Sequence, residues 1–213
     1  MRIAISQPYF FPYLGYFKLI KSVDKFVFFD DVQYIRRGWV NRNKIRHDDS
    51  IWLTVPVKKS SRNSLINEIL IDSDWSYLVD KHKKTFLNIY GKNIETNSFY
   101  DFYDELKKHT MLNKLLCESI IWLSRKMGIK TEFLHSSDFP SNNKKEHRII
   151  DTCKQLNATE YYNLPGGVKL YSEDFFMQNS IKLKFIETSM YKKISIIETI
   201  FLNDFNSEEF CFS

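Results

Sequence analysis

The residues best suited to chemistry lie near the N-terminus, where two short apolar runs end in polar side chains. Gln7 follows the run 2–6, and Asp30 and Asp31 follow the run 26–29. A carboxylate at such a position can deprotonate an amine or bind a sugar hydroxyl, and the amide of Gln7 can donate fixed hydrogen bonds. Because neighbouring residues of a strand point to opposite faces, at most one of the two aspartates faces a given ligand. We predict Asp30, Asp31 and Gln7 as catalytic residues; a solvated strand end is the alternative for the aspartates.

The segment that follows the aspartates combines cationic, aromatic and amide side chains within a few residues. An arginine can hold a diphosphate through two parallel hydrogen bonds, a tryptophan can stack on a base or a sugar, and an asparagine can bind hydroxyl or amide groups. A solvated basic loop is the alternative interpretation. The residues that we predict to bind substrate here are Gln33, Arg36, Trp39, Asn41, Arg42, Asn43 and Lys44.

Two turns add further candidates for substrate binding. Tyr9, Tyr13, Gly15 and Tyr16 surround the expected start of a helix, whose free N–H groups and partial positive charge suit a phosphate. Gly15 would allow a close approach to the first helical turn. A Pro-Gly-Gly turn later in the chain could place main-chain N–H groups near a ligand, or it could be only a turn. The predicted binding residues around it are Asn163, Gly166, Gly167 and Tyr171.

The elements that must position these residues begin with a βαβ unit. Residues 2–6 and 26–29 have the apolar character of buried strands, and the apolar positions of 14–23 follow helical spacing. This order predicts a parallel strand pair with a right-handed crossover. Ligands of such sheets bind outside the carboxyl ends of the strands, where Gln7 and the two aspartates stand.

The rest of the chain predicts a mixed α/β fold with a more helical middle. We see no internal repeat or linker, so we expect one domain over 1–213. The expected strands are 51–57, 67–71, 130–134, 160–163 and 181–186, and the expected helices are 75–90, 101–109, 112–127, 145–156 and 172–179.

Composition narrows the classes of function. The net charge of +5 is spread along the chain, which argues against a nucleic-acid partner and suits a small anionic substrate such as a nucleotide sugar. Cys117, Cys153 and Cys211 form no CxxC pair, and no histidine stands at metal-ligand spacing, so we predict no metal and no disulfide. The sequence shows neither a leader nor an apolar run of about 18 residues. We therefore expect a cytoplasmic protein without membrane insertion, whose oligomeric state is open.

Several blocks together resemble the WbqC-like protein family. The first is Ile5 to Phe17 (ISQPYFFPYLGYF), similar to a QPxYxPWxGYF pattern; the second is Phe29 to Tyr34 (FDDVQY); the third is Trp39 to Ile45 (WVNRNKI). Shorter matches are 53–57, 148–163, Gly166-Gly167 with Tyr171, and 195–198. The chain departs from the pattern at Tyr13, where tryptophan is usual, which exchanges one flat ring for another.

The resemblance implies a role in the biosynthesis of O-antigen and related surface polysaccharides. It suggests an N-acyl or aminoacyl transferase, for example a glycyl transferase, that forms an amide on a nucleotide-linked amino sugar. Arg36, Arg42 and Lys44 would hold the diphosphate. The acyl donor is open: an acyl carrier, coenzyme A or an aminoacyl donor would serve, and no other cofactor is implied.

A second resemblance concerns the turn after the first strand, residues 11–16, which is similar to the HxGH region of nucleotidyltransferases and pantothenate synthetase. Those folds place a nucleotide on this helix N-terminus. Both histidine positions are tyrosines here, Tyr13 and Tyr16, which puts adenylyl transfer in doubt. A nucleotidyl-transfer or adenylate-forming ligase is therefore one alternative, and a non-catalytic nucleotide-sugar-binding protein is the other.

Overall fold

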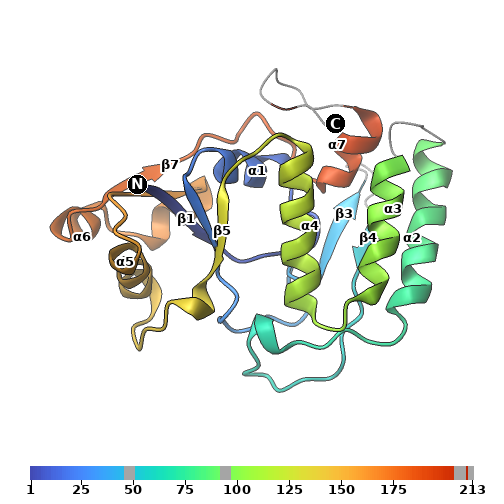
Figure 1. Cartoon of the computed structure of the whole chain (residues 1–213), viewed down its shortest axis with the longest axis horizontal. Helices are drawn as coiled ribbons and strands as arrows, with labels where there is room; N and C mark the ends of the chain where they lie inside the picture. Colours follow the sequence, from blue (N-terminus) through green and yellow to red (C-terminus); the bar gives the residue numbers. More distant parts are fainter. Residues whose placement is uncertain (46–50, 92–96, 204–209, 211–213) are drawn as a thin grey trace.

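A five-stranded parallel sheet forms the centre of the molecule (Figure 1). The computed structural model describes residues 1–45, 51–91, 97–203 and Phe210. The order of the strands across the sheet is β5-β2-β1-β6-β7, and each neighbouring pair is parallel. Their bounds are β1 Arg2–Ser6, β2 Lys25–Phe28, β5 Glu132–His135, β6 Glu160–Asn163 and β7 Lys182–Phe185. The predicted α/β class with a parallel βαβ core is confirmed; the single domain remains a prediction.

Each face of the sheet has its own apolar core. Ala4, Phe26 and Phe28 contribute to the larger core, which includes α1 (Leu14–Lys21) and α4 (Leu112–Lys126). The alternate residues Ile3, Ile5 and Val27 contribute to a second core with α5 (Lys145–Gln155) and α6 (Glu173–Gln178). Burial on both faces explains why β1 and β2 are almost continuously apolar in sequence.

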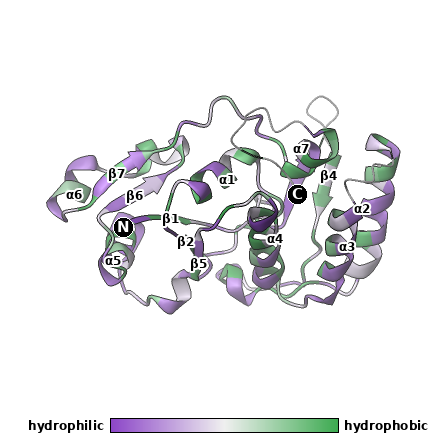
Figure 2. Cartoon of the chain, turned by 45° about the horizontal axis from the view of Figure 1, so that its top comes forward, coloured by the Kyte–Doolittle hydropathy of each residue, from purple (hydrophilic) through white to green (hydrophobic). Residues whose placement is uncertain are grey.

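The larger core extends into a helical half of the molecule. Helices α2 (Trp75–Tyr90), α3 (Asn97–Glu105) and α7 (Ile196–Leu202) lie beside the antiparallel pair of β3 (Arg42–Ile45) and β4 (Ile51–Thr54) (Figure 1). Hydrophobic and hydrophilic segments alternate along α2, α3 and α4 (Figure 2), as expected for helices with one buried side. No helix in the part of the chain that the structure describes has the length and apolar character needed to cross a membrane.

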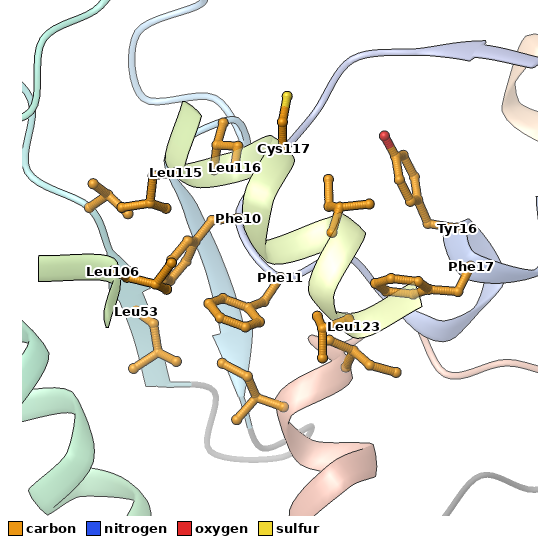
Figure 3. Packing of buried hydrophobic residues seen from close by; sticks show 14 of the residues in the cluster. Phe10, Phe11, Tyr16, Phe17, Leu53, Leu106, Leu115, Leu116, Cys117 and Leu123 are labelled. Atoms are coloured by element: carbon orange, nitrogen blue, oxygen red, sulfur yellow. The ribbon is translucent and has the colours of Figure 1, made fainter. Parts of the chain in front are cut away.

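Helix α4 connects the two halves. Leu115, Leu116 and Leu123 share a cluster with aromatic residues of the N-terminal turn, among them the fully buried Phe10 and Phe11 (Figure 3). Cys117 lies on the same helix, and its thiol donates a 3.3 Å hydrogen bond to the side-chain oxygen of Asn113. Apolar packing against α4 therefore fixes the position of the turn after β1.

Two predicted elements differ in the structure. Residues 67–71 are not a strand: a 3-10 helix, Ile66–Glu68, is followed by single bridges from Leu70 to Met111 and from Ile71 to Val57. Leu70 and Ile71 each pair with a different segment, so no continuous run of paired residues forms. The strand expected over 51–57 ends at Thr54, two residues before Pro56, which has no N–H to donate.

The remaining predictions concern helix bounds and thiols. The predicted helix 101–109 begins earlier, at Asn97, and its last turn is the 3-10 helix Leu106–Lys108. Cys117 and Cys153 are buried. Cys211 lies outside the described residues.

Candidate functional site

The strand order creates a switch point between β1 and β6. From β1 the chain moves to β2 and β5 on one side, and it then returns to β6 and β7 on the other side. Connections leave the carboxyl ends of β1 and β6 in opposite directions, which opens a crevice above the sheet where open α/β folds bind their ligands.

A cavity of about 750 Å³ lies at this point. Tyr9 and Tyr13 line it from the segment after β1, and Leu164, Pro165 and Gly166 from the segment after β6. The other lining residues are Trp39, Asn43, Glu187, Thr188, Ser189 and Lys193. Its size is within the range of small-molecule sites, and its walls combine aromatic rings with a few polar groups.

The two tyrosines form a wall fixed by short-range contacts. The Tyr9 hydroxyl accepts a 3.3 Å hydrogen bond from the Tyr13 N–H, and the Tyr13 hydroxyl donates to Thr188 Oγ1 at 3.4 Å. Burial raises the pKa of both phenols, which therefore stay neutral. A Cβ at Gly15 would lie 2.4 Å from Tyr13 Cε2. The close approach that we predicted at Gly15 is made by the ring of Tyr13.

Asn43 supports the cavity through the backbone of the N-terminal turn. Its Nδ2 donates to the carbonyls of Phe10 (3.1 Å) and Phe11 (2.7 Å), and its Oδ1 accepts from the Lys44 N–H (2.8 Å). The Ser195 hydroxyl donates to the same Phe11 carbonyl at 3.0 Å. Phe11 has a φ of 44°, uncommon for a residue with a side chain. Three sequence blocks far apart in the chain thus converge on one strained turn.

A carboxylate–imidazole pair lies at the same edge of the sheet, where β2 and β5 end. Asp30 is 1% exposed, and its Oδ2 is 2.8 Å from His135 Nδ1. Asn113 Nδ2 donates to the same oxygen at 3.0 Å, and the Ser137 N–H donates to Oδ1 at 3.3 Å. With Nδ1–H donating to Asp30, His135 Nε2 can accept a proton, and 39% of this side chain is exposed.

The electrostatics of the pair follow from these contacts. Burial alone would raise the pKa of Asp30, but the hydrogen bonds from His135, Asn113 and Ser137 outweigh it and hold this pKa below its ordinary value. The hydrogen bond to Asp30 raises the pKa of His135, although partial burial opposes the change. Asp30 thus orients the imidazole of His135 and favours its protonated form, an arrangement that is common in sites of proton transfer.

Asp31 shares the Ser136 hydroxyl with Asp30 but is otherwise bound by a different partner. Its Oδ2 accepts a 2.6 Å bond from the buried Arg148 guanidinium, and its Oδ1 accepts from the Ser136 hydroxyl. Arg148 also donates to the Ser136 carbonyl at 3.0 Å. Beyond Ser136 the two carboxylates have different partners, Asn113 of α4 for Asp30 and Arg148 of α5 for Asp31.

Gln7 is not part of the cavity lining; it lies at the end of the strand between β2 and β6. It directly follows β1, its side chain is exposed, and its carbonyl accepts a 3.0 Å hydrogen bond from the buried Tyr16 hydroxyl. Neighbouring strands are roughly 5 Å apart, so the edge from the end of β5 to the end of β6 spans about three such steps. An extended ligand can therefore contact the cavity and the pair at once.

Several predicted binding residues make contacts outside the cavity. The Arg42 guanidinium donates to the Gly38 carbonyl at 3.0 Å and lies 4.2 Å above the Trp52 ring. Lys44 Nζ is 4.9 Å from the same ring. The side chains of Gln33, Arg36 and Asn41 donate to the carbonyls of Arg62, Ser60 and Val55. These contacts hold β3, β4 and the adjoining loops together.

The predicted binding residues around the Pro-Gly-Gly turn also fall into two groups, one that lines the cavity and one that packs outside it. Gly166 lines the cavity, whereas Gly167 is buried against Asn163, whose Oδ1 accepts from the Leu164 N–H at 2.7 Å. The Tyr171 ring packs on Tyr161, 5.8 Å between centroids. Of the predicted binding residues, the cavity brings together Tyr9, Tyr13, Trp39, Asn43 and Gly166.

The structure adds residues that we did not predict, above all His135. Histidine spacing, which we used only to exclude a metal site, gives no sign of it. The position of His135 does indicate it, because His135 ends a strand of the sheet and Asp30 follows the neighbouring one. Lys193 and Thr188 also line the cavity, from a loop whose sequence carries no motif. Among the described residues, no three His, Cys, Asp or Glu side chains gather as a metal-binding group.

Fold and site together define a class: an α/β protein with a parallel sheet and a cavity at its switch point. The chain belongs to the WbqC-like protein family, whose sequence model matches residues 7–204. It is 31% identical over 197 residues to the uncharacterized protein Rv1507c of Mycobacterium tuberculosis (strain ATCC 25618 / H37Rv), a match that covers 90% of this chain and 84% of that protein. No solved structure matches the chain with significant similarity.

Proposed function

We propose that this protein is an N-acyl or aminoacyl transferase, for example a glycyl transferase, that forms an amide on a nucleotide-linked amino sugar. The reaction would serve the biosynthesis of O-antigen or another surface polysaccharide. The observation that carries the proposal is the cavity at the switch point, which lies along one sheet edge with the Asp30–His135 pair.

The cavity suits the nucleotide part of such a substrate. Trp39 and Tyr13 offer flat rings for a base or a sugar, and Thr188 and the two tyrosine hydroxyls offer neutral hydrogen-bonding groups. Lys193 would supply the positive charge for the diphosphate, in a lining that also contains the carboxylate of Glu187. Arg36, Arg42 and Lys44, for which we expected this role, would add to the local positive potential from outside the lining.

The Asp30–His135 pair suits the chemistry at the sugar amine. The neutral amine attacks the acyl carbon of the donor, and His135 Nε2 takes the proton that the nitrogen loses. Asp30 stabilises the resulting imidazolium through the 2.8 Å hydrogen bond to Nδ1. His135 then gives the proton to the leaving group of the donor. In this mechanism Asp30 acts through His135, the exposed amide of Gln7 would donate to the acyl oxygen, and Asp31 fixes the local structure through Arg148.

The test measures amide formation from UDP- and dTDP-linked amino sugars with thioester and aminoacyl donors. We expect His135→Gln and Asp30→Asn to lower turnover by about 10²–10⁴-fold, with binding of the nucleotide sugar preserved. His147→Gln, an exposed histidine on α5, is the matched control. Undiminished turnover in His135→Gln would refute the catalytic role of the pair. The absence of a thermal shift with every nucleotide amino sugar would refute the substrate class.

A nucleotidyl-transfer or adenylate-forming ligase is the second candidate, because the switch-point cavity would also accommodate ATP. The tyrosine at the second histidine position argues against it: Tyr16 is fully buried, and its hydroxyl donates to the Gln7 carbonyl rather than toward the cavity. Release of pyrophosphate that requires both ATP and an acyl acid would favour this candidate. Acylation from a thioester without ATP would favour the transferase.

A further inference from the structure

Two neighbouring loops carry a concentration of exposed cations. We call this the basic surface; its members are Arg36, Arg37, Lys58, Lys59 and Arg62, all exposed. Backbone and side-chain contacts join the loops: the Gln33 amide donates to the Arg62 carbonyl at 2.9 Å, and the Tyr34 N–H donates to the Ser64 carbonyl at 2.9 Å. The two loops therefore present their charges side by side.

The basic surface is not balanced by acidic residues of its own loops. No Asp or Glu occurs in residues 32–45 or 51–67. Its five cations equal the net charge of the whole chain, +5, so the remaining charged residues balance one another. Glu68, the next acid along the chain, accepts from the Leu65 N–H. The five cations of the basic surface therefore have no acidic residue within 32–45 or 51–67 to balance them.

Large apolar side chains are exposed beside these cations. Ile35 is 62% exposed, Trp39 54% and Trp52 40%. The rings of Trp39 and Trp52 pack together with centroids 5.1 Å apart. Ile35 precedes Trp39 across a turn that a 3.1 Å hydrogen bond from the Gly38 N–H to the Ile35 carbonyl closes. An exposed group of apolar and cationic side chains marks an interaction site rather than an ordinary solvated surface.

We propose that this side of the protein binds peripherally to an anionic lipid bilayer. Lys and Arg near a negatively charged bilayer each contribute favourable binding energy, and tryptophan prefers the interface between headgroups and acyl chains. Ile35 favours a bilayer among the possible polyanions, because an exposed aliphatic side chain gains free energy on entering lipid, whereas nucleic acids are bound mainly through charged, polar and stacking side chains.

The position of this surface has a consequence for the cavity. Trp39 belongs both to the exposed apolar group and to the cavity wall. Binding to a bilayer through this surface therefore brings the mouth of the cavity close to the lipid headgroups. Binding to the bilayer depends on these exposed residues alone, whether or not the protein is a transferase.

The experiment is co-sedimentation of the whole protein with vesicles of phosphatidylglycerol and phosphatidylcholine in equal parts, and with vesicles of phosphatidylcholine alone. We expect binding to the anionic vesicles that weakens as salt is added. Since each cation contributes about fivefold to partitioning, Lys58→Gln/Lys59→Gln should lower it by roughly 25-fold. Ile35→Ser should lower it by up to about tenfold. Lys81→Gln/Lys84→Gln, which removes two exposed cations of α2, should change it little.

Three outcomes would overturn the proposal. The first is equal binding, or none, to the two kinds of vesicle. The second is an equal loss in the Lys58/Lys59 and Lys81/Lys84 variants, which would indicate an effect of net charge alone. The third is binding to a single-stranded DNA oligonucleotide together with no binding to anionic vesicles, which would assign the surface to nucleic acid.

Discussion

Replacing His135 with glutamine removes the cation that faces the buried Asp30 but keeps a hydrogen-bond donor at the same place. The wild-type contact is a charge-assisted hydrogen bond of 2.8 Å when the imidazole is protonated. Such bonds contribute about 1.5–3 kcal/mol when buried. Because the His135 side chain is 39% exposed, solvent screening reduces this, and we expect about 1 kcal/mol.

The pH dependence of this contribution has a definite sign. The pKa of His135 is raised in the folded protein, so its stabilisation is complete below the ordinary value of about 6.5 and is lost as pH rises through the raised pKa. The pKa of Asp30 is lowered, so its share is present above about 4 and is lost as pH falls through the lowered value. The pair therefore stabilises the fold most between about pH 4 and 6.5.

The assay is urea unfolding followed by tryptophan fluorescence, with His147→Gln as the control. We expect His135→Gln to be less stable than the wild type by about 1 kcal/mol more at about pH 5.5 than at about pH 9. Titration of the His135 ring by NMR should show its pKa falling in Asp30→Asn. A wild-type-minus-variant difference that is the same at both pH values, or larger at the higher one, would refute the reasoning.

Three further predictions follow from single contacts. Asn43→Ala leaves the Phe10 carbonyl without its side-chain donor and the Phe11 carbonyl with only that of Ser195. This should lower the free energy of unfolding by about 1–3 kcal/mol, whereas the exposed Asn142→Ala should lower it by less than about 0.5 kcal/mol; equal losses in urea unfolding would contradict the role of Asn43. Gly15→Ala should push the Tyr13 ring from the cavity wall and weaken binding of a nucleotide sugar in calorimetry with little change in Tm; unchanged affinity would count against that wall. Burial, aided by the charge of Lys81, lowers the pKa of His82 to about 4. The free energy of unfolding of the wild type should therefore fall by up to about 3 kcal/mol between about pH 6.5 and 4, and that of a His82→Gln variant by much less. The same dependence of unfolding free energy on pH in both proteins would show that this histidine does not titrate as argued.

Local patterns were enough to predict the frame of the site. The apolar runs 2–6 and 26–29 and the helical spacing between them are short-range features, so the βαβ unit and the place of Asp30 at its carboxyl edge could be predicted. The prediction of a strand over 67–71 was wrong because Ile69 and Ile71 are buried equally well by a 3-10 turn followed by single bridges.

The partners of the site residues could not be predicted, because they depend on pairing between distant segments. Asp30 meets His135 only because β2 pairs with β5, and the two residues are 105 positions apart. Asn43 was predicted to bind substrate, but its amide group can equally well donate hydrogen bonds to the carbonyls of a backbone turn. Only packing decides that its two donors face the carbonyls of Phe10 and Phe11.

The most direct test of the central claim is a crystal structure of the protein with a UDP-linked amino sugar bound. We predict electron density for the nucleotide between Tyr13 and Trp39, with the sugar amine within hydrogen-bonding distance of His135 Nε2. A nucleotide sugar bound at another surface, with the cavity above β1 and β6 left to solvent, would contradict the proposed site.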